Sequence, residues 1–197
     1  PLNAILGWTK ILLTKEVDDK TRRSALETIE RSALSQAKLI SDLVDSSRIA
    51  SGKLRLEMGP VNLYDAVRTI FNAQKPTAEA KNISLDFASD TYRATVFGDL
   101  VRLQQIVANL LSNALKFTQP GGTVQMEMNS DNKTVRISVR DNGQGISEET
   151  LPRIFRQFAQ GEQTNSSDHN GLGLGLSIVK ILAEKHKGSV TAHSDGP

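Results

Sequence analysis

The sequence predicts an α+β chain in two parts, an antiparallel two-helix hairpin followed by an α/β-sandwich domain with helices on one face of a mixed sheet. Apolar residues recur every three or four positions over roughly the first 50 residues, as they do in helices. From residue 54 onward, short alternating segments typical of strands are mixed with helical ones. Because strands and helices do not alternate strictly, we expect an α+β arrangement.

The composition is that of an ordinary globular protein, with 38% hydrophobic and 23% charged residues among 197. The 24 Lys and Arg residues nearly balance the 22 Asp and Glu residues, and no basic block is present, so we expect no nucleic-acid partner. The absence of cysteine excludes disulfides and thiolate metal sites. No segment approaches the length of a membrane span, and none is expected within this sequence.

Residues 1–52 predict a helical hairpin, with the polar stretch 16–20 between its helices and Asp19 or Thr21 as the cap of the second. Spacings of three and four form a coiled-coil seam along the second helix, at Leu26, Ile29, Ala33, Gln36, Ile40, Leu43, Ser47 and Ala50. One hairpin cannot bury this seam alone, so we expect a homodimer that forms a four-helix bundle. Packing of the hairpin on the rest of its own chain is the alternative.

Residues 53–197 form the second part, in which period-two alternation predicts strands and helical periodicity predicts helices. The expected strands are 54–58, 83–87, 94–97, 123–128, 134–139 and 188–193. The expected helices run from Val61 to about Lys81 with a bend or break at Pro76, from Asp99 to Phe117, from Glu149 to Phe158 and from Gly173 to Lys187. Asn62 and Asp99 are the expected caps, and the polar residues 129–132 predict an antiparallel strand pair.

A polar face lies along the helix that begins at Asp99. Asn109, Asn113 and Lys116 occupy positions i, i+4 and i+7, which places all three on one side. An amide oxygen can enter the octahedral shell of Mg²⁺, and a lysine supplies a point charge for phosphate. This face therefore suits a magnesium triphosphate, although the solvated side of an amphipathic helix gives the same pattern.

The second segment is Asp141-Asn-Gly143-Gln-Gly145, directly after an expected strand. Asp-Asn-Gly is common in hairpin turns, which is one interpretation. The residues that follow, beginning at Ser147, instead resemble a capped helix start and not a returning strand. A carboxylate at a strand end beside flexible glycines can also accept a hydrogen bond from an adenine amino group.

The third segment is Gly171-Leu-Gly173-Leu-Gly175, which leads from a polar loop into a helix. It is not a Walker motif, because no Gly-Lys-Ser/Thr follows, and no strand precedes it as in a dinucleotide fingerprint. Free backbone N–H groups and the helix dipole at such a start favour phosphate. A flexible hinge is the alternative.

Taken in order, these three segments resemble the N box and the two glycine boxes of sensor histidine kinases. The stretch from Arg153 to Phe158 is similar to the F box of that family, and residues 99–109 match the usual approach to the N box. The hairpin resembles the dimerisation and phosphotransfer domain. The opening Pro1-Leu-Asn-Ala-Ile-Leu-Gly resembles residues just after the H box, so we expect the acceptor histidine about five residues upstream, and no catalytic residue within this sequence.

The resemblance implies a Bergerat-type fold that binds ATP and Mg²⁺. It implies Asn113 and, in support, Asn109 as metal ligands, Asp141 as the adenine-reading carboxylate, and residues 159–170 as a lid. Phe155 and Phe158 would anchor the near end of that lid. The full implied ATP-binding set is Asn109, Asn113, Lys116, Phe117, Asp141, Gly143, Gly145, Ile146, Gly171, Leu172, Gly173, Leu174 and Gly175.

The chemistry at position 109 favours a kinase. The gyrase, Hsp90 and MutL-type ATPases resemble one another in carrying a glutamate there, which activates water as a general base, whereas Asn109 cannot. The expected function is a protein-histidine kinase in the cytoplasmic portion of a bacterial-type sensor, with a response-regulator receiver domain as partner. His169, His186 and His193 are given no catalytic role. A non-catalytic pseudokinase scaffold and an ATP-hydrolysing clamp are the alternatives, and we expect the last strand to be truncated.

Overall fold

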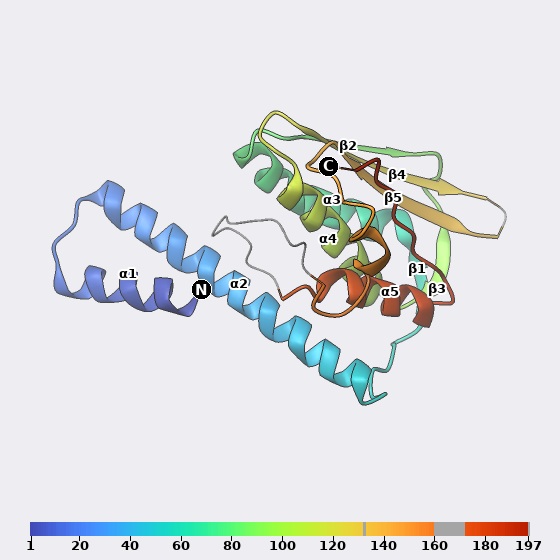
Figure 1. The fold of residues 1–197 in the computed structure, drawn as a ribbon, viewed down its shortest axis with the longest axis horizontal. Coiled ribbons are helices and arrows are strands. Elements are labelled where there is room, and N and C mark those ends of the chain that lie inside the picture. Colours follow the sequence, from blue (N-terminus) through green and yellow to red (C-terminus); the bar gives the residue numbers. More distant parts are fainter. Residues whose placement is uncertain (132, 160–171, 197) are drawn as a thin grey trace.

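The computed structural model describes residues 1–131, 133–159 and 172–196. Helices α1 (Leu2–Thr14) and α2 (Asp19–Ala50) form the hairpin, which projects to one side of an α/β domain while α2 continues past α1 along that domain (Figure 1). The Asp18 side chain caps α2 by accepting a hydrogen bond of 2.7 Å from the Thr21 backbone N–H. The prediction of Asp19 or Thr21 as the cap was therefore wrong, because the carboxylate must precede the first turn.

The main sheet has the strand order β2-β4-β5, with β2 (Ser84–Ser89), β4 (Thr123–Ser130) and β5 (Val135–Asp141). Strand β2 is parallel to β4, whereas β5 is antiparallel to it, so the predicted mixed sheet and the predicted β4–β5 hairpin are both confirmed. Strands β1 (Gly59–Asn62) and β3 (Thr95–Gly98) form a separate antiparallel pair.

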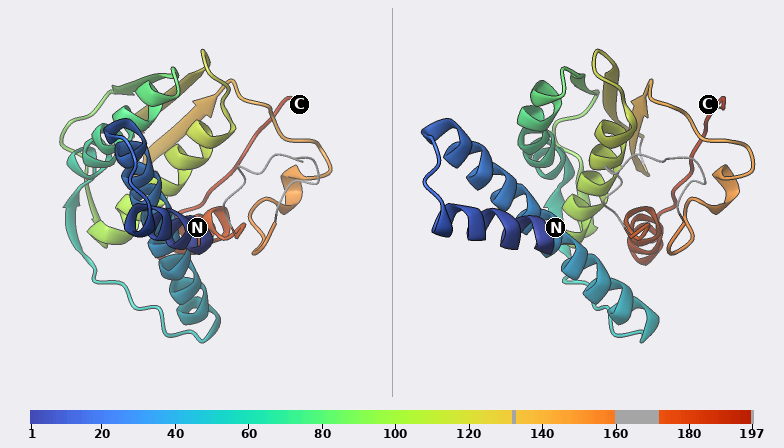
Figure 2. Two further views of the ribbon diagram at one scale, coloured as in Figure 1. Left: turned by 90° about the vertical axis from the view of Figure 1, so that its left-hand side faces the viewer. Right: turned by 60° about the vertical axis from the view of Figure 1, so that its left-hand side comes forward.

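Helices α3 (Leu63–Ala80) and α4 (Leu100–Phe117) cover one face of the main sheet, as the two views of Figure 2 show. Every second residue of β4 is buried against them, namely Val124, Met126 and Met128. Helix α5 (Gly175–Lys185) packs against α4 and also against α2. The core of the α/β domain therefore positions α4 between the sheet and α5.

Leu111 lies at the centre of this core on α4 and is fully buried. We expect Leu111→Ala to lower the free energy of unfolding by about 2–5 kcal/mol, because packing contacts are lost and a cavity remains. Urea unfolding followed by circular dichroism measures the change. Leu100→Ala, at the exposed start of the same helix, is the control and should change stability by less than about 0.5 kcal/mol. Equal losses in the two variants would contradict this assignment of the core.

Several predicted elements differ in the structure. Residues 54–58 are not a strand, because the alternating Leu54 and Leu56 pack against α5 instead of a sheet. Helix α3 runs unbroken through Pro76, whose missing N–H removes only one hydrogen bond near the helix end. Residues 149–158 contain only a short 3₁₀ turn, η1 (Leu151–Arg153), and within 188–196 the structure has no strand.

Candidate functional site

Helix α4 places the first predicted segment between the hairpin and α5. The Asp99 side chain caps the helix by accepting from the Arg102 backbone N–H at 3.1 Å, as predicted. Asn109 is only 2% exposed. Its Nδ2 donates to the Gly175 carbonyl at 3.4 Å, and its Oδ1 accepts from Lys38 Nζ of α2 at 2.8 Å. Asn109 thus links α4 to the start of α5 and to the hairpin.

Asn113 and Lys116 follow on the same side of α4 and are half-buried. Burial lowers the pKa of the Lys116 ammonium, and the nearby charge of Lys81 lowers it further. The Lys116 ammonium also lies 4.9 Å from the centroid of the Phe117 ring, which is within cation–π range. A partly desolvated ammonium at this position gains more from a bound anion than one that is fully hydrated.

The second segment follows β5 and is joined to the end of α4. Asp141 Oδ1 accepts from the Gly143 N–H at 3.0 Å, and the Gln144 N–H donates to the Phe117 carbonyl at 3.3 Å. The described residues after Asp141, up to 159, contain no returning strand, so the hairpin-turn interpretation was wrong. Gly145 has a φ of +71°, a backbone conformation that favours glycine.

Gly143 has no room for a side chain. A Cβ at this position would lie 2.5 Å from the Phe117 carbonyl oxygen and 2.7 Å from Asp141 Oδ1. The glycine therefore permits the close approach of the loop to α4. Next along this loop, the Ile146 N–H donates to Ser194 Oγ at 2.9 Å, which ties the loop to the C-terminal segment.

The third segment leads into α5. Gly173 has a φ of +69°, and its carbonyl accepts from the Phe158 N–H at 3.1 Å, so α5 begins at Gly175 and not at Gly173 as predicted. Leu174 precedes α5 without a side-chain cap and is buried, whereas Leu172 is exposed. Gly171 and residues 160–170 of the predicted lid lie outside the described residues.

These contacts bring the three segments together along one helix. Asn109 touches the start of α5, and Phe117 touches the loop that follows β5. The two residues are eight positions apart, which corresponds to about 12 Å of helix. An extended ligand that contacts both ends would therefore lie along the polar face of α4.

The sequence interpretation missed a second set of residues, at the contact between α2 and α4. Asp42, Asp45 and Ser46 of α2 are all buried. Burial raises the pKa of the Asp42 carboxyl, and the ammonium of Lys38, 3.5 Å away, opposes that shift. Arg102 Nη1 donates to Asp45 Oδ2 at 2.6 Å. The helical spacing of Lys38, Asp42 and Asp45 is the one sequence signal that points to this buried contact. Polar residues with that spacing more often form a solvated helix face.

The donor chemistry of the site fits Mg²⁺ bound together with phosphate. Within the described ranges no group of three His, Cys, Asp or Glu side chains could hold a metal ion. Mg²⁺ requires few protein ligands when phosphate oxygens and water complete its octahedral shell, and amide oxygens such as those of Asn109 and Asn113 are suitable. None of the described helices combines the length and the apolar composition that a membrane span requires.

Comparison with known proteins gives two family matches, one in the hairpin and one in the α/β domain. Residues 98–196 match the histidine kinase-, DNA gyrase B-, and HSP90-like ATPase family, and residues 1–52 match the His Kinase A (phospho-acceptor) domain. The sensor histidine kinase GacS of Pseudomonas protegens is 38% identical over 201 residues, a match that covers 98% of this chain and 22% of GacS. The chain thus spans about a fifth of the length of this curated relative.

Solved histidine kinases have a similar fold. The crystal structure of ShkA in complex with AMPPNP matches 93% of this chain and 38% of the ShkA chain, with a TM-score of 0.68 and 30% identity. Histidine kinase ThkA, in complex with the response regulator protein TrrA, matches 95% of this chain and 52% of its own chain, with a TM-score of 0.62 and 24% identity.

Proposed function

Because the chain belongs to the histidine kinases, as the core of a two-component sensor kinase, we propose that it binds ATP together with Mg²⁺ and delivers the γ-phosphoryl group to a histidine. The phosphoryl group would then pass to an aspartate of a response regulator. The family match over residues 98–196 and the nucleotide analogue in the ShkA complex support the ATP site.

The observation that carries the proposal is the pair of contacts at the two ends of the polar face of α4. Gly143 closes the adenine end against Phe117, and Asn109 joins the phosphate end to the first turn of α5. Among the residues that the structure describes, no side chain caps the backbone N–H groups of that first turn, and such groups bind phosphate oxygens readily. A nucleotide would therefore lie along the polar face of α4 with its phosphates toward α5.

We assign roles by position along α4. Asn113 and Asn109 would supply amide oxygens to Mg²⁺, and Lys116 would contact phosphate. Asp141 would accept a hydrogen bond from the adenine amino group. Bound Mg²⁺ would neutralise charge on the phosphate oxygens. The other members of the set would line the pocket or contact phosphate: Phe117, Gly143, Gly145, Ile146, Gly171, Leu172, Gly173, Leu174 and Gly175.

The side chain at position 109 favours transfer of the γ-phosphoryl group to another residue over hydrolysis of ATP. The Asn109 amide cannot take a proton from water, so attack by water on the γ-phosphate gains no general base here. In-line attack by a neutral imidazole needs positioning and charge neutralisation, which the residues above would provide. The γ-phosphoryl group would thus be retained until an acceptor histidine is aligned with it.

The proposed partners follow from the hairpin, residues 1–52, for which we propose dimerisation. Large apolar side chains of its seam are more than half exposed, namely Leu26, Ile40 and Leu43, and a second hairpin would bury them. The ThkA complex with TrrA supports a response-regulator receiver domain as second partner. Residues 53–197 would then form the ATP-binding domain, and we propose that this part of the parent kinase operates in the cytoplasm.

Labelling of the full-length protein with [γ-³²P]ATP and Mg²⁺ tests the proposal. We expect phosphate that is labile in acid and stable in base, as on histidine. Asp141→Ala should weaken ATP binding about tenfold or more, because a charged acceptor for the adenine amino group is lost, and should reduce labelling. Asp86→Ala, an exposed site on β2, is the control. Absence of labelling in the wild type, or rapid phosphate release without it, would contradict the proposal.

A further inference from the structure

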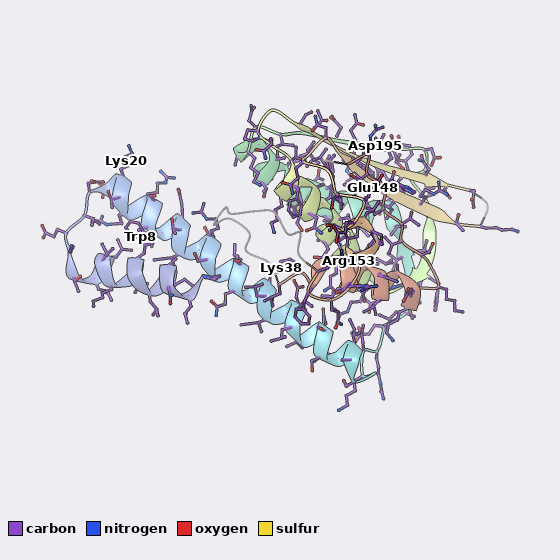
Figure 3. All side chains as sticks on the ribbon, viewed as in Figure 1. Trp8, Lys20, Lys38, Glu148, Arg153 and Asp195 are labelled. Atoms are coloured by element: carbon purple, nitrogen blue, oxygen red, sulfur yellow. The ribbon has the colours of Figure 1, made fainter. Side chains whose placement is uncertain are left out.

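Lys38 connects the hairpin directly to the proposed metal-binding end of the site. It lies midway along α2, where the helix passes the α/β domain (Figure 3). Its Nζ is 2.8 Å from Asn109 Oδ1, although the two residues are 71 positions apart in sequence. Asn109 is only 2% exposed, so the acceptor side of this partly buried hydrogen bond is shielded from water.

The partners of Asn109 fix the orientation of its amide. Nδ2 donates to the Gly175 carbonyl, which can only accept, and Oδ1 faces an ammonium, which can only donate. The reverse orientation would set an NH₂ group against Lys38. Asn109 Oδ1, the atom that would bind a metal ion, is therefore already bound to the Lys38 ammonium of the hairpin.

We propose that Lys38 is an autoinhibitory latch, whose ammonium competes with Mg²⁺ for Asn109 Oδ1 and couples release of α2 to binding of the Mg²⁺–nucleotide complex. This inference rests on the proposed function. A divalent cation on the same buried oxygen would repel the ammonium, because two cations would then compete for one ligand atom. Coupling of this kind is reciprocal, so the docked hairpin lowers the affinity for Mg²⁺–ATP as much as Mg²⁺–ATP weakens docking.

The displaced ammonium has an alternative partner. Asp42 Oδ2 lies 3.5 Å from Lys38 Nζ, one turn further along the same helix. The Asp42 side chain is largely buried, whereas about half of the Lys38 side chain is exposed. Lys38 can thus turn away from Asn109 while it keeps its ion pair with Asp42, and the latch can open without leaving either charge unpaired.

The test compares the affinity of wild-type protein and Lys38→Met for a fluorescent ATP analogue, with Mg²⁺ and with EDTA. Methionine keeps the apolar stem and removes the charge. We expect Lys38→Met to bind about tenfold tighter in Mg²⁺, the effect of one charge-assisted hydrogen bond, and to match the wild type in EDTA. Lys20→Met, at the far end of α2 (Figure 3), is the matched control and should bind like the wild type in both conditions.

A cross-linking experiment measures the docking of α2 on the α/β domain directly. The 197 residues contain no cysteine, so within them the only thiols would be those introduced by Ser46→Cys and Gln157→Cys, whose native side chains lie 3.4 Å apart. Mg²⁺–ATP should slow their cross-linking by a bismaleimide, and Lys38→Met should remove most of that dependence.

The outcomes separate the latch from the proposed function. Unchanged affinity in Lys38→Met would overturn the latch. So would weaker binding both with and without Mg²⁺, which would identify Lys38 as a phosphate contact. If neither protein binds the nucleotide at all, the proposed function fails and the latch fails with it.

Discussion

Gly143→Ala is expected to weaken ATP binding by about a hundredfold. The added Cβ would lie 2.5 Å from the Phe117 carbonyl oxygen and 2.9 Å from its carbonyl carbon. Both are backbone atoms at the end of α4 and cannot turn aside as a side-chain tip could. The loop would have to move away from α4 and carry Asp141 with it, and loss of a hydrogen bond to a charged group alone is worth about 1.5–3 kcal/mol.

Isothermal titration of ATP into the purified variant measures this effect. Gly59→Ala is the matched control, because no atom lies within 4 Å of its would-be Cβ and its backbone conformation suits any residue. Circular dichroism should show that Gly143→Ala retains its fold, since the loop can shift without opening the core. Wild-type affinity in Gly143→Ala would refute the assignment of this loop to the nucleotide site.

Local sequence signals predicted helix α4 and the β4–β5 hairpin well, because each of them depends mainly on near neighbours. Asp99 caps α4 from the position directly before its first turn. The alternation of Val124, Met126 and Met128 follows the period of a strand with one buried face. The polar turn after β4 joins strands adjacent in sequence, so no distant segment was needed to define it.

Segments that depend on distant packing were not predicted. The alternation of Leu54 and Leu56 is the same in a strand and in an extended segment, and only the presence of α5 beside it decides between them. The start of α5 follows Gly173, which has a positive φ and whose carbonyl accepts a hydrogen bond from the distant Phe158 N–H. Residues 188–193 have strand-like alternation, but within the described chain no neighbouring strand pairs with them.

The residues of the candidate site likewise divide into those that local motifs predict and those that depend on distant packing. The residues of the three motifs were found because each motif is short and has its own spacing. Lys38 and Asp45 were not found, because their role depends on how α2 docks against α4, more than 50 residues away. Spacings of four and three between Lys38, Asp42 and Asp45 do mark a second polar face on α2, but from sequence alone that face does not differ from a solvated one.

Arg102→Gln is expected to detach α2 from α4 in most molecules, because the Asp45 carboxylate would then be buried without its cation. Asp45 Oδ2 accepts from Arg102 Nη1 at 2.6 Å and from Gln105 Nε2 at 2.8 Å, and the Asp45 and Arg102 side chains are only 6% and 17% exposed. Loss of one partner from a buried ion pair costs about 3–5 kcal/mol. Separation of the helices rehydrates Asp45, so we expect undocking and not unfolding.

Amide hydrogen exchange of residues 42–49 and 102–109 measures the undocking of α2 from α4. In Arg102→Gln we expect faster exchange in both segments and unchanged protection of the sheet. The double variant Asp45→Asn with Arg102→Gln should recover much of the lost protection, because no charge is then left unpaired. Arg22→Gln is the control, since the Asp19–Arg22 pair has the same chemistry but is exposed to solvent and contributes little. If the double variant were as unprotected as Arg102→Gln, the buried charge could not be the cause, and loss of the Arg102 side-chain packing would explain the undocking instead.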